Sequence, residues 1–137
     1  FAADAAQLAN KMGARFVRPG MLSPADADAL ENSADVLVSL GNAYDNQMPS
    51  KLFGYFATGK PVLHLAVSES DPTLPYLARY PLALVLHAGE GVTPGVVAKL
   101  DKWLHDVKGK HLPFAEVAKL YPEFTPEKVA EAFLRGM

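Results

Sequence analysis

The sequence predicts an α/β fold: a Rossmann-like parallel sheet of at least four strands with helices on both faces, incomplete at its amino-terminal end and followed by carboxyl-terminal helices. Two observations lead to this prediction. Short apolar runs alternate with segments of helical spacing along the chain. Two of these runs, Asp35 to Leu40 and Pro61 to Leu65, have the length and composition of strands buried on both faces, with one short helix between them. This order is a βαβ unit, whose strands are parallel.

The first third of the chain predicts two helices and a strand. Apolar residues at helical spacing indicate a helix over residues 3–12, and a short strand is expected over 16–18. Ser23 is expected to cap a second helix over 24–32. Asp26 lies in the first turn of this helix, where its negative charge suits the helix dipole.

The helix of the βαβ unit has a cap at each end. Ser50 is a good N-cap, because its hydroxyl can accept a hydrogen bond from an N–H of the first turn, and Gly59 can close the helix in the left-handed conformation. The first N–H groups of this helix, near Ser50, Lys51 and Leu52, are expected to point into a crevice beyond the carboxyl end of the preceding strand. Phosphates bind at this place in such sheets.

The second half of the chain continues the alternation and ends in helices. Thr93 is the expected cap of a long helix. The predicted elements are a loop over 67–72, a helix over 73–79, a strand over 82–87, the long helix over 94–107, a connector over 108–111, and helices over 113–120 and 126–134. A buried stripe on the long helix is predicted for Val96, Val97, Leu100, Trp103, Leu104 and Val107.

Composition limits the classes of function. The chain has 137 residues, of which 50% are hydrophobic and 20% charged, with a net charge of −2, and this is typical of a globular domain without the basic footprint of a nucleic-acid-binding protein. The absence of cysteine excludes disulfides and thiolate metal sites and fits a cytoplasmic location. No apolar run reaches the roughly 18 residues of a membrane span. Because the chain opens on Phe1 directly before a helix-like segment, we expect an excised domain whose upstream part is missing.

The segment from Ala34 to Leu65 carries a resemblance to a known family. Its centre reads Pro49-Ser50-Lys51-Leu52-Phe53-Gly54-Tyr55-Phe56-Ala57-Thr58-Gly59-Lys60-Pro61. This resembles the donor-binding half of GT-B glycosyltransferases, particularly the retaining group whose helix has the form P-S-K-L-hydrophobic-E-Y-hydrophobic-A-x-G-K-P. Over residues 5–107 the chain is similar to the carboxyl-terminal two-thirds of the nucleotide-sugar-binding domain of that family.

The resemblance implies a domain organisation and a set of partners. It implies a partial Rossmann-like donor-binding domain over residues 1–108, followed over 109–137 by a connector and helices that pack on it or on a missing amino-terminal lobe of the same protein. The implied substrate is a nucleotide diphosphate sugar, and no metal or other cofactor is expected. Acceptor chemistry would belong to the missing lobe, so the isolated chain is not expected to be active. An apolar stripe left exposed on the last helix would favour self-association into a homo-oligomer.

The chain departs from the family pattern at two positions. Gly54 stands where the family usually has a glutamate whose carboxylate binds the ribose hydroxyls, and Asn46 stands where many members have a second glutamate. Glycine in a helix costs about 1 kcal/mol relative to alanine, so local stability does not explain Gly54. Either Asp45 or Glu69 binds the ribose, or the nucleotide is bound differently, or donor binding has been lost.

The candidate site residues each have a structural alternative. Ser50 caps its helix whether or not a phosphate binds, Lys51 could be a solvated lysine of the first turn, and the loop over 42–47 could be a polar surface turn. A long loop at the carboxyl end of a central strand is nevertheless where binding groups gather. The expected nucleotide-sugar site therefore comprises Gly41, Asn42, Tyr44, Asp45, Asn46, Gln47, Ser50, Lys51, Leu52 and Gly54.

The histidines and one acidic loop are interpreted as structural or solvated. His64 and His87 lie inside apolar strands and are predicted to be hydrogen-bonded structural imidazoles, whereas His105 and His111 are expected to be exposed. The loop from Ser68 to Asp71 is expected to be solvated and to face the same crevice. No nucleophile and base, paired carboxylates or glycine-rich phosphate loop can be assembled from spacing alone.

Three hypotheses of function remain. The first is the donor-binding lobe of a glycosyltransferase that moves a sugar from a nucleotide diphosphate to an acceptor. The second is a non-catalytic module of the same fold, kept for assembly or regulation, which the loss of both glutamates favours. The third is an unrelated doubly wound domain, such as a flavodoxin-like receiver or a small-ligand binder. A receiver needs an acidic cluster after its first strand, and the strand over 16–18 offers none.

Overall fold

The computed structural model describes residues 22–41 and 50–122, and it divides the chain into two compact units, Phe1–Ser33 and Ala34–Met137. In the first unit the described element is helix α2, Pro24–Ser33. The backbone N–H of Asp26 donates to Oγ of Ser23 over 3.2 Å, which confirms Ser23 as the cap. The helices predicted over 3–12 and 126–134 and the strand predicted over 16–18 lie outside the described residues.

The second unit contains a parallel sheet. The described residues form three strands, β1 (Leu37–Leu40), β2 (Val62–Ala66) and β3 (Ala83–His87), in the order β1-β2-β3. Leu37 pairs with Val62, and Val62 pairs with Ala83, both in parallel register. The parallel βαβ arrangement is confirmed, whereas a fourth strand is not, because the segment predicted to form it is not described.

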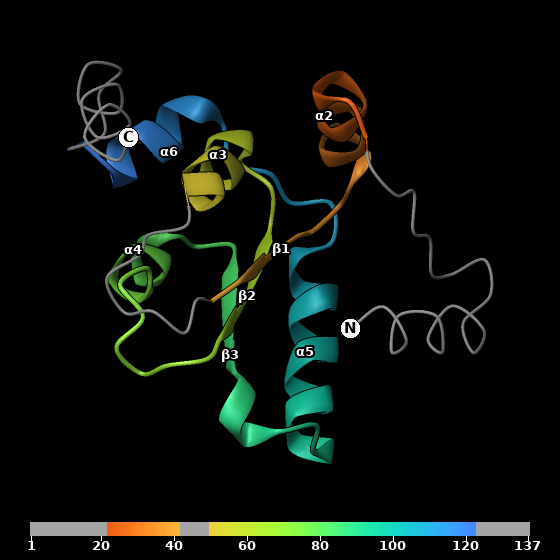
Figure 1. Ribbon diagram of the computed structural model, residues 1–137, viewed down its shortest axis with the longest axis vertical. Coiled ribbons are helices and arrows are strands. Elements are labelled where there is room, and N and C mark those ends of the chain that lie inside the picture. The colour runs from red at the N-terminus through yellow and green to blue at the C-terminus, as the bar shows by residue number, and fades with distance from the viewer. Residues whose placement is uncertain (1–21, 42–49, 123–137) are drawn as a thin grey trace. The chain divides into compact units, whose positions relative to one another are not determined.

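Helices surround the sheet of the second unit. Those in the described residues are α3 (Ser50–Thr58), α4 (Leu74–Arg79), α5 (Pro94–Val107) and α6 (Phe114–Leu120), and a 3₁₀ turn, η2 (Ala88–Glu90), follows β3. Figure 1 shows α4 and α5 on opposite sides of the strands, and α3 next to α6. The helix boundaries agree with the sequence prediction to within about two residues. The carboxyl ends of the three parallel strands meet at one edge of the sheet.

Gly59 ends α3 as the sequence predicts. Its φ of +74° is in the left-handed region, and its N–H donates to the carbonyl of Phe56 over 3.0 Å. The chain after α5 packs directly on this turn, because the N–H of Leu112 donates to the carbonyl of Gly59 over 2.8 Å. A Cβ at Gly59 would lie only 2.0 Å from that residue's carbonyl oxygen. Both the backbone angle and the close approach therefore require glycine here.

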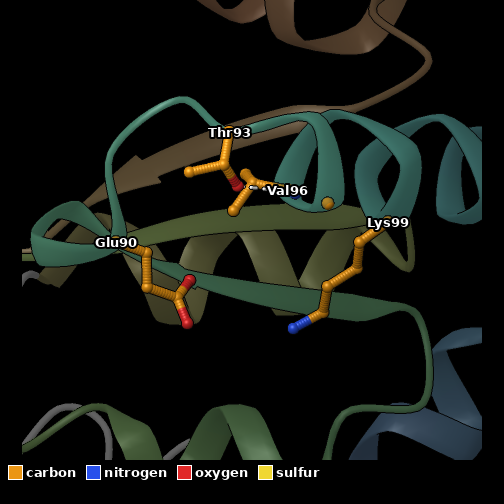
Figure 2. Close-up of a pocket in the computed structure, with 5 residues that line it drawn as sticks. Glu90, Thr93, Val96 and Lys99 are labelled. Atoms are coloured by element: carbon orange, nitrogen blue, oxygen red, sulfur yellow. Dashed lines mark hydrogen bonds between the residues drawn. The ribbon is translucent and has the colours of Figure 1, made fainter.

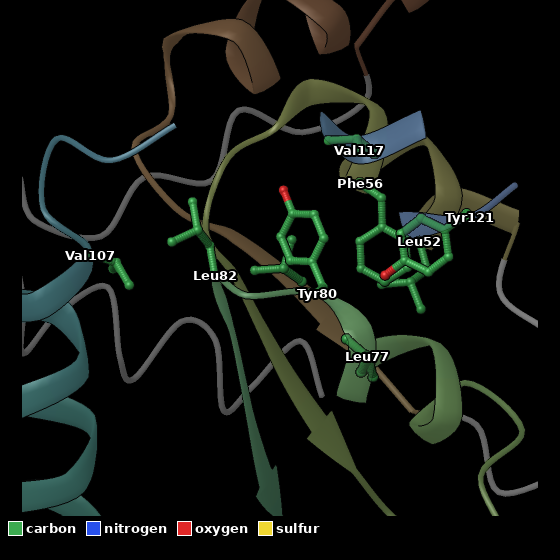
Figure 3. Packing of buried hydrophobic residues seen from close by; sticks show 9 residues of the cluster. Leu52, Phe56, Leu77, Tyr80, Leu82, Val107, Val117 and Tyr121 are labelled. Atoms are coloured by element: carbon green, nitrogen blue, oxygen red, sulfur yellow. The ribbon is translucent and has the colours of Figure 1, made fainter. Parts of the chain in front are cut away.

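Aromatic rings at the centre of the core join three helices. The ring of Phe56 on α3 stacks on Tyr80, which follows α4, with centroids 4.7 Å apart, and on Tyr121, which follows α6, at 5.0 Å (Figure 3). The hydroxyl of Tyr121 donates to the carbonyl of Tyr76, and that of Tyr80 donates to the carbonyl of Lys60. The aromatic centre of the core thus connects α3 with the residues that follow α4 and α6.

Three burial predictions are wrong. In β1, Val38 and Leu40 are 50% and 67% exposed, so among the described residues this edge strand is covered on one face only. In α5, Val97 and Leu104 of the predicted buried stripe are also exposed. On α3 the sequence predicts Phe53, Phe56 and Ala57 to be core residues; Phe56 is buried, but Ala57 is exposed. An apolar run shows that a segment can be buried, but it does not show whether a second layer covers it.

Candidate functional site

Some of the predicted site residues lie in the described part of the chain, and the others lie outside it. Gly41 directly follows β1, and Leu52 and Gly54 lie on α3. The side chain of Leu52 is fully buried in the core, so only its backbone can serve a ligand. Gly54 is exposed, and a Cβ added there would meet nothing within 4 Å. The predicted contributions of Asn42, Tyr44, Asp45, Asn46 and Gln47, and of the side chains of Ser50 and Lys51, lie outside the described residues.

Gly41 is held closely at the point where the chain leaves β1. Its N–H donates to the carbonyl of Leu65 over 2.7 Å, which extends the pairing of β1 and β2 by one residue. A Cβ at this position would lie 2.9 Å from Oδ2 of Asp71 and 2.9 Å from the carbonyl oxygen of Leu65. Glycine is therefore required because the backbone approaches a carboxylate closely, which is one of the uses of glycine in binding loops.

A buried polar cluster lies beneath this point. Nδ1 of His64 on β2 is 2.9 Å from Oγ of Ser39 on β1, and Nε2 of His64 is 2.8 Å from Oδ2 of Asp71. The other oxygen of Asp71 accepts hydrogen bonds from the N–H and the hydroxyl of Thr73, which precedes α4. All four residues are buried, and within the described part of the chain no buried polar side-chain atom lacks a partner.

Hydrogen bonding keeps the Asp71 carboxyl charged. Burial raises its pKa, but the hydrogen bonds from Thr73 and His64 act in the opposite direction and together hold the pKa below the ordinary value of 3.8. A carboxylate only accepts hydrogen bonds, so Nε2 of His64 must carry the proton that faces it. In a neutral imidazole, Nδ1 then accepts from the hydroxyl of Ser39, and every side-chain donor in the cluster is used.

The order Ser39, His64, Asp71 resembles that of a nucleophilic triad, but the surroundings exclude this use. A catalytic serine must present its hydroxyl to a substrate, and Ser39 on β1 is only 6% exposed. The imidazole of His64 is fully buried as well. The prediction that His64 is a hydrogen-bonded structural imidazole is therefore confirmed.

The structure corrects one interpretation of the acidic loop. Asp71 was expected to be solvated with the loop that follows β2, yet it is 4% exposed. The reason is its partners, since a buried carboxylate is tolerated where hydrogen bonds satisfy both oxygens. The sequence contained one signal for this arrangement: Asp-Pro-Thr before a helix is typical of a turn in which the aspartate bonds the N–H two residues later.

Two open hollows lie near the carboxyl end of β3, and one of them also borders the carboxyl end of β2. One has a volume of about 320 Å³ and is lined by both loops, with Ser68 and Glu69 from the first and His87 and Glu90 from the second. The other, of about 480 Å³, lies at the start of α5. Figure 2 shows Thr93 accepting from the N–H of Val96, while Glu90 and Lys99 extend on one side of this hollow. Thr93 is confirmed as the cap of α5.

The remaining histidines do not form a site with other ligands. The prediction of a structural imidazole at His87 is wrong, because His87 is the last residue of β3 and its side chain is exposed. His105 and His111 are exposed as predicted. Among the described residues, no three His, Asp or Glu side chains lie close enough together to hold a metal ion. In the same part of the chain, no helix is both long and apolar enough to cross a membrane.

Comparison with known protein families, curated proteins and solved structures finds no match to this chain.

Proposed function

We propose that this chain is the donor-binding lobe of a glycosyltransferase that transfers a sugar from a nucleotide diphosphate sugar to an acceptor. The observation that supports this best is the parallel unit of β1, α3 and β2, in which α3 begins at Ser50 after the carboxyl end of β1. In open parallel sheets, ligands bind beyond the carboxyl ends of the strands, and phosphates bind at a helix N-terminus there.

In this proposal the chain positions the donor and stabilises charge. The first N–H groups of α3 and the positive end of its dipole offset the negative charge that grows on the departing diphosphate. Gly41 lets the backbone approach the ligand closely, as it already approaches Asp71. The acceptor and the groups that act on its hydroxyl belong to a separate amino-terminal lobe, which is a further part of the proposal.

Gly54 favours a second candidate function. Its exposed position carries no carboxylate for the ribose hydroxyls, which agrees with a module of the same fold that no longer binds nucleotides. If the chain is a donor-binding lobe, we propose that another carboxylate binds the ribose hydroxyls. Glu69, exposed on the hollow beyond β2, is the described residue that we propose for it.

Calorimetric titration separates the two candidates. The chain is titrated with UDP, GDP and their sugar conjugates, and with uridine and guanosine as ligands that lack the diphosphate. A donor-binding lobe gives saturable heat with one diphosphate and little with its nucleoside. Replacing Lys51 with alanine should weaken this binding, whereas Lys99→Ala, on the exposed surface of α5, should not. An absence of heat with every diphosphate at millimolar concentration supports the non-catalytic module.

A further inference from the structure

We propose that His64 and Asp71 are positioning residues of the nucleotide-sugar site, which fix the backbone at Gly41 without touching the nucleotide. The ligand in this inference rests on the proposed function. The cluster that performs the positioning, Ser39, His64, Asp71 and Thr73, is here called the His64 clamp.

The His64 clamp joins three elements at one place. Its imidazole connects Ser39 on β1 with Asp71 in the loop after β2, through hydrogen bonds at both ring nitrogens. Asp71 in turn binds the N–H of Thr73 over 2.8 Å, immediately before α4 begins. One imidazole and one carboxylate therefore connect β1, the loop after β2 and the start of α4, in addition to the backbone pairing of β1 and β2.

The Asp71 carboxylate affects the proposed site through the backbone of Gly41. There is no space for even one methyl group between its Cα and Oδ2 of Asp71, and its N–H is bonded to the carbonyl of Leu65. A displacement of the Asp71 carboxylate consequently changes the space available to the backbone of Gly41. Gly41 is the residue that directly follows β1, so the clamp acts on the backbone at the carboxyl end of this strand.

Burial shows that the effect must be indirect. The side chains of His64 and Asp71 are 0% and 2% exposed, so a nucleotide cannot reach either polar group. Their hydrogen bonds are all made within the protein. An influence on binding can therefore act only through the backbone that they hold.

Two variants of Asp71 test the inference. Asp71→Ala removes the carboxylate that binds His64 and Thr73. Asp71→Asn keeps the shape: its oxygen can still accept from Thr73, and its amide can donate to Nε2 of His64 if the ring proton moves to Nδ1. Val117→Ala, which truncates a buried residue of α6 outside the clamp, is the control for general destabilisation. Each protein is measured by calorimetry with the preferred nucleotide diphosphate and by amide hydrogen exchange at Gly41.

We expect Asp71→Ala to bind the nucleotide about tenfold more weakly and to exchange the Gly41 amide about tenfold faster, with Asp71→Asn restoring both values. Val117→Ala should lower the unfolding temperature and leave the nucleotide affinity unchanged. If Asp71→Ala does not fold, Ser39→Ala removes a single hydrogen bond of the clamp and provides the same comparison at a smaller amplitude.

Wild-type affinity and wild-type Gly41 exchange in Asp71→Ala would overturn the inference, and so would effects no larger than those of Val117→Ala. A wild-type chain that binds no nucleotide would overturn the proposed function and, with it, the role of the clamp in binding. The exchange measurement separates these failures, because it shows whether the clamp holds Gly41 in the absence of any ligand.

Discussion

Nε2 of His64 lies 2.8 Å from Oδ2 of Asp71, and neither side chain has appreciable contact with solvent. A buried carboxylate would ordinarily be destabilising, since charge is costly to remove from water. Here the cost is offset by hydrogen bonds to both oxygens, from His64 on one side and Thr73 on the other. The folded state thus favours the charged form of Asp71 and lowers its pKa, and this has consequences for stability.

The first prediction concerns acid. Because the folded state holds the pKa of Asp71 below 3.8, the pair contributes stability that is complete above that pH and is lost as the pH falls through the lower, folded pKa. In denaturant titrations, the free energy of unfolding of the wild type should therefore fall more steeply below about pH 4 than that of Asp71→Asn. A difference between the two proteins that stays constant from pH 7 to pH 2 would contradict this account.

The second prediction concerns the end of α3. Gly59→Ala should reduce the free energy of unfolding by about 3 kcal/mol or more, because it combines a left-handed backbone angle with a Cβ placed 2.0 Å from the carbonyl oxygen of Leu112. Gly109 is the matched control, since its φ is also positive but a Cβ there meets nothing. Gly109→Ala should cost only about 1–2 kcal/mol. Equal losses in the two variants would show that the approach of residue 112 is unimportant.

The third prediction concerns alkaline pH. Burial raises the pKa of Tyr80 from 10.0 to about 12, so its contribution to stability is complete below pH 10 and is lost as the pH rises toward 12. Tyr80→Phe also loses the hydrogen bond to the carbonyl of Lys60 and should be about 1–2 kcal/mol less stable at neutral pH. Its stability should depend less on pH above 10. Ultraviolet titration that finds every tyrosine ionising near pH 10 in the folded protein would be inconsistent with this environment.

The fourth prediction concerns the ribose. The open space around Gly54 accommodates a larger side chain without a clash. A charged hydrogen bond contributes about 1.5–3 kcal/mol, so Gly54→Glu should tighten nucleotide binding by at least about tenfold if the rest of the pocket is intact. Gly54→Gln provides the same helix stabilisation without the charge and should give a smaller gain. Unchanged or weaker binding in Gly54→Glu would indicate that the ribose pocket has been remodelled.

Most of the described fold could be predicted from residues whose role is local, such as helix caps and apolar runs. Ser23 and Thr93 were recognised as caps because a hydroxyl before a helix-compatible run has a direct local role, and Gly59 was recognised as a stop for a similar reason. The strands β2 and β3 were visible as apolar runs. The exposure of Val38 and Leu40 was not predictable, since it depends on whether another layer covers that face of β1.

The candidate site was predicted less completely. Gly41 was selected for its place after a strand, but its contact with Asp71 joins residues that are far apart in the sequence. The pairing of His64 with Ser39 depends on the register between β1 and β2, which the sequence does not specify residue by residue. Such a cluster becomes visible only when strands are aligned in three dimensions.

The central claim is that a nucleotide diphosphate binds at the start of α3. The most direct test is nuclear magnetic resonance of the isotope-labelled chain during titration with UDP or GDP, following backbone amides. The account predicts the largest shifts at Gly41 and in the first turn of α3 through Leu52, with small shifts in α6. An absence of shifts at these amides at saturating nucleotide, or shifts confined to α5 or α6, would contradict it.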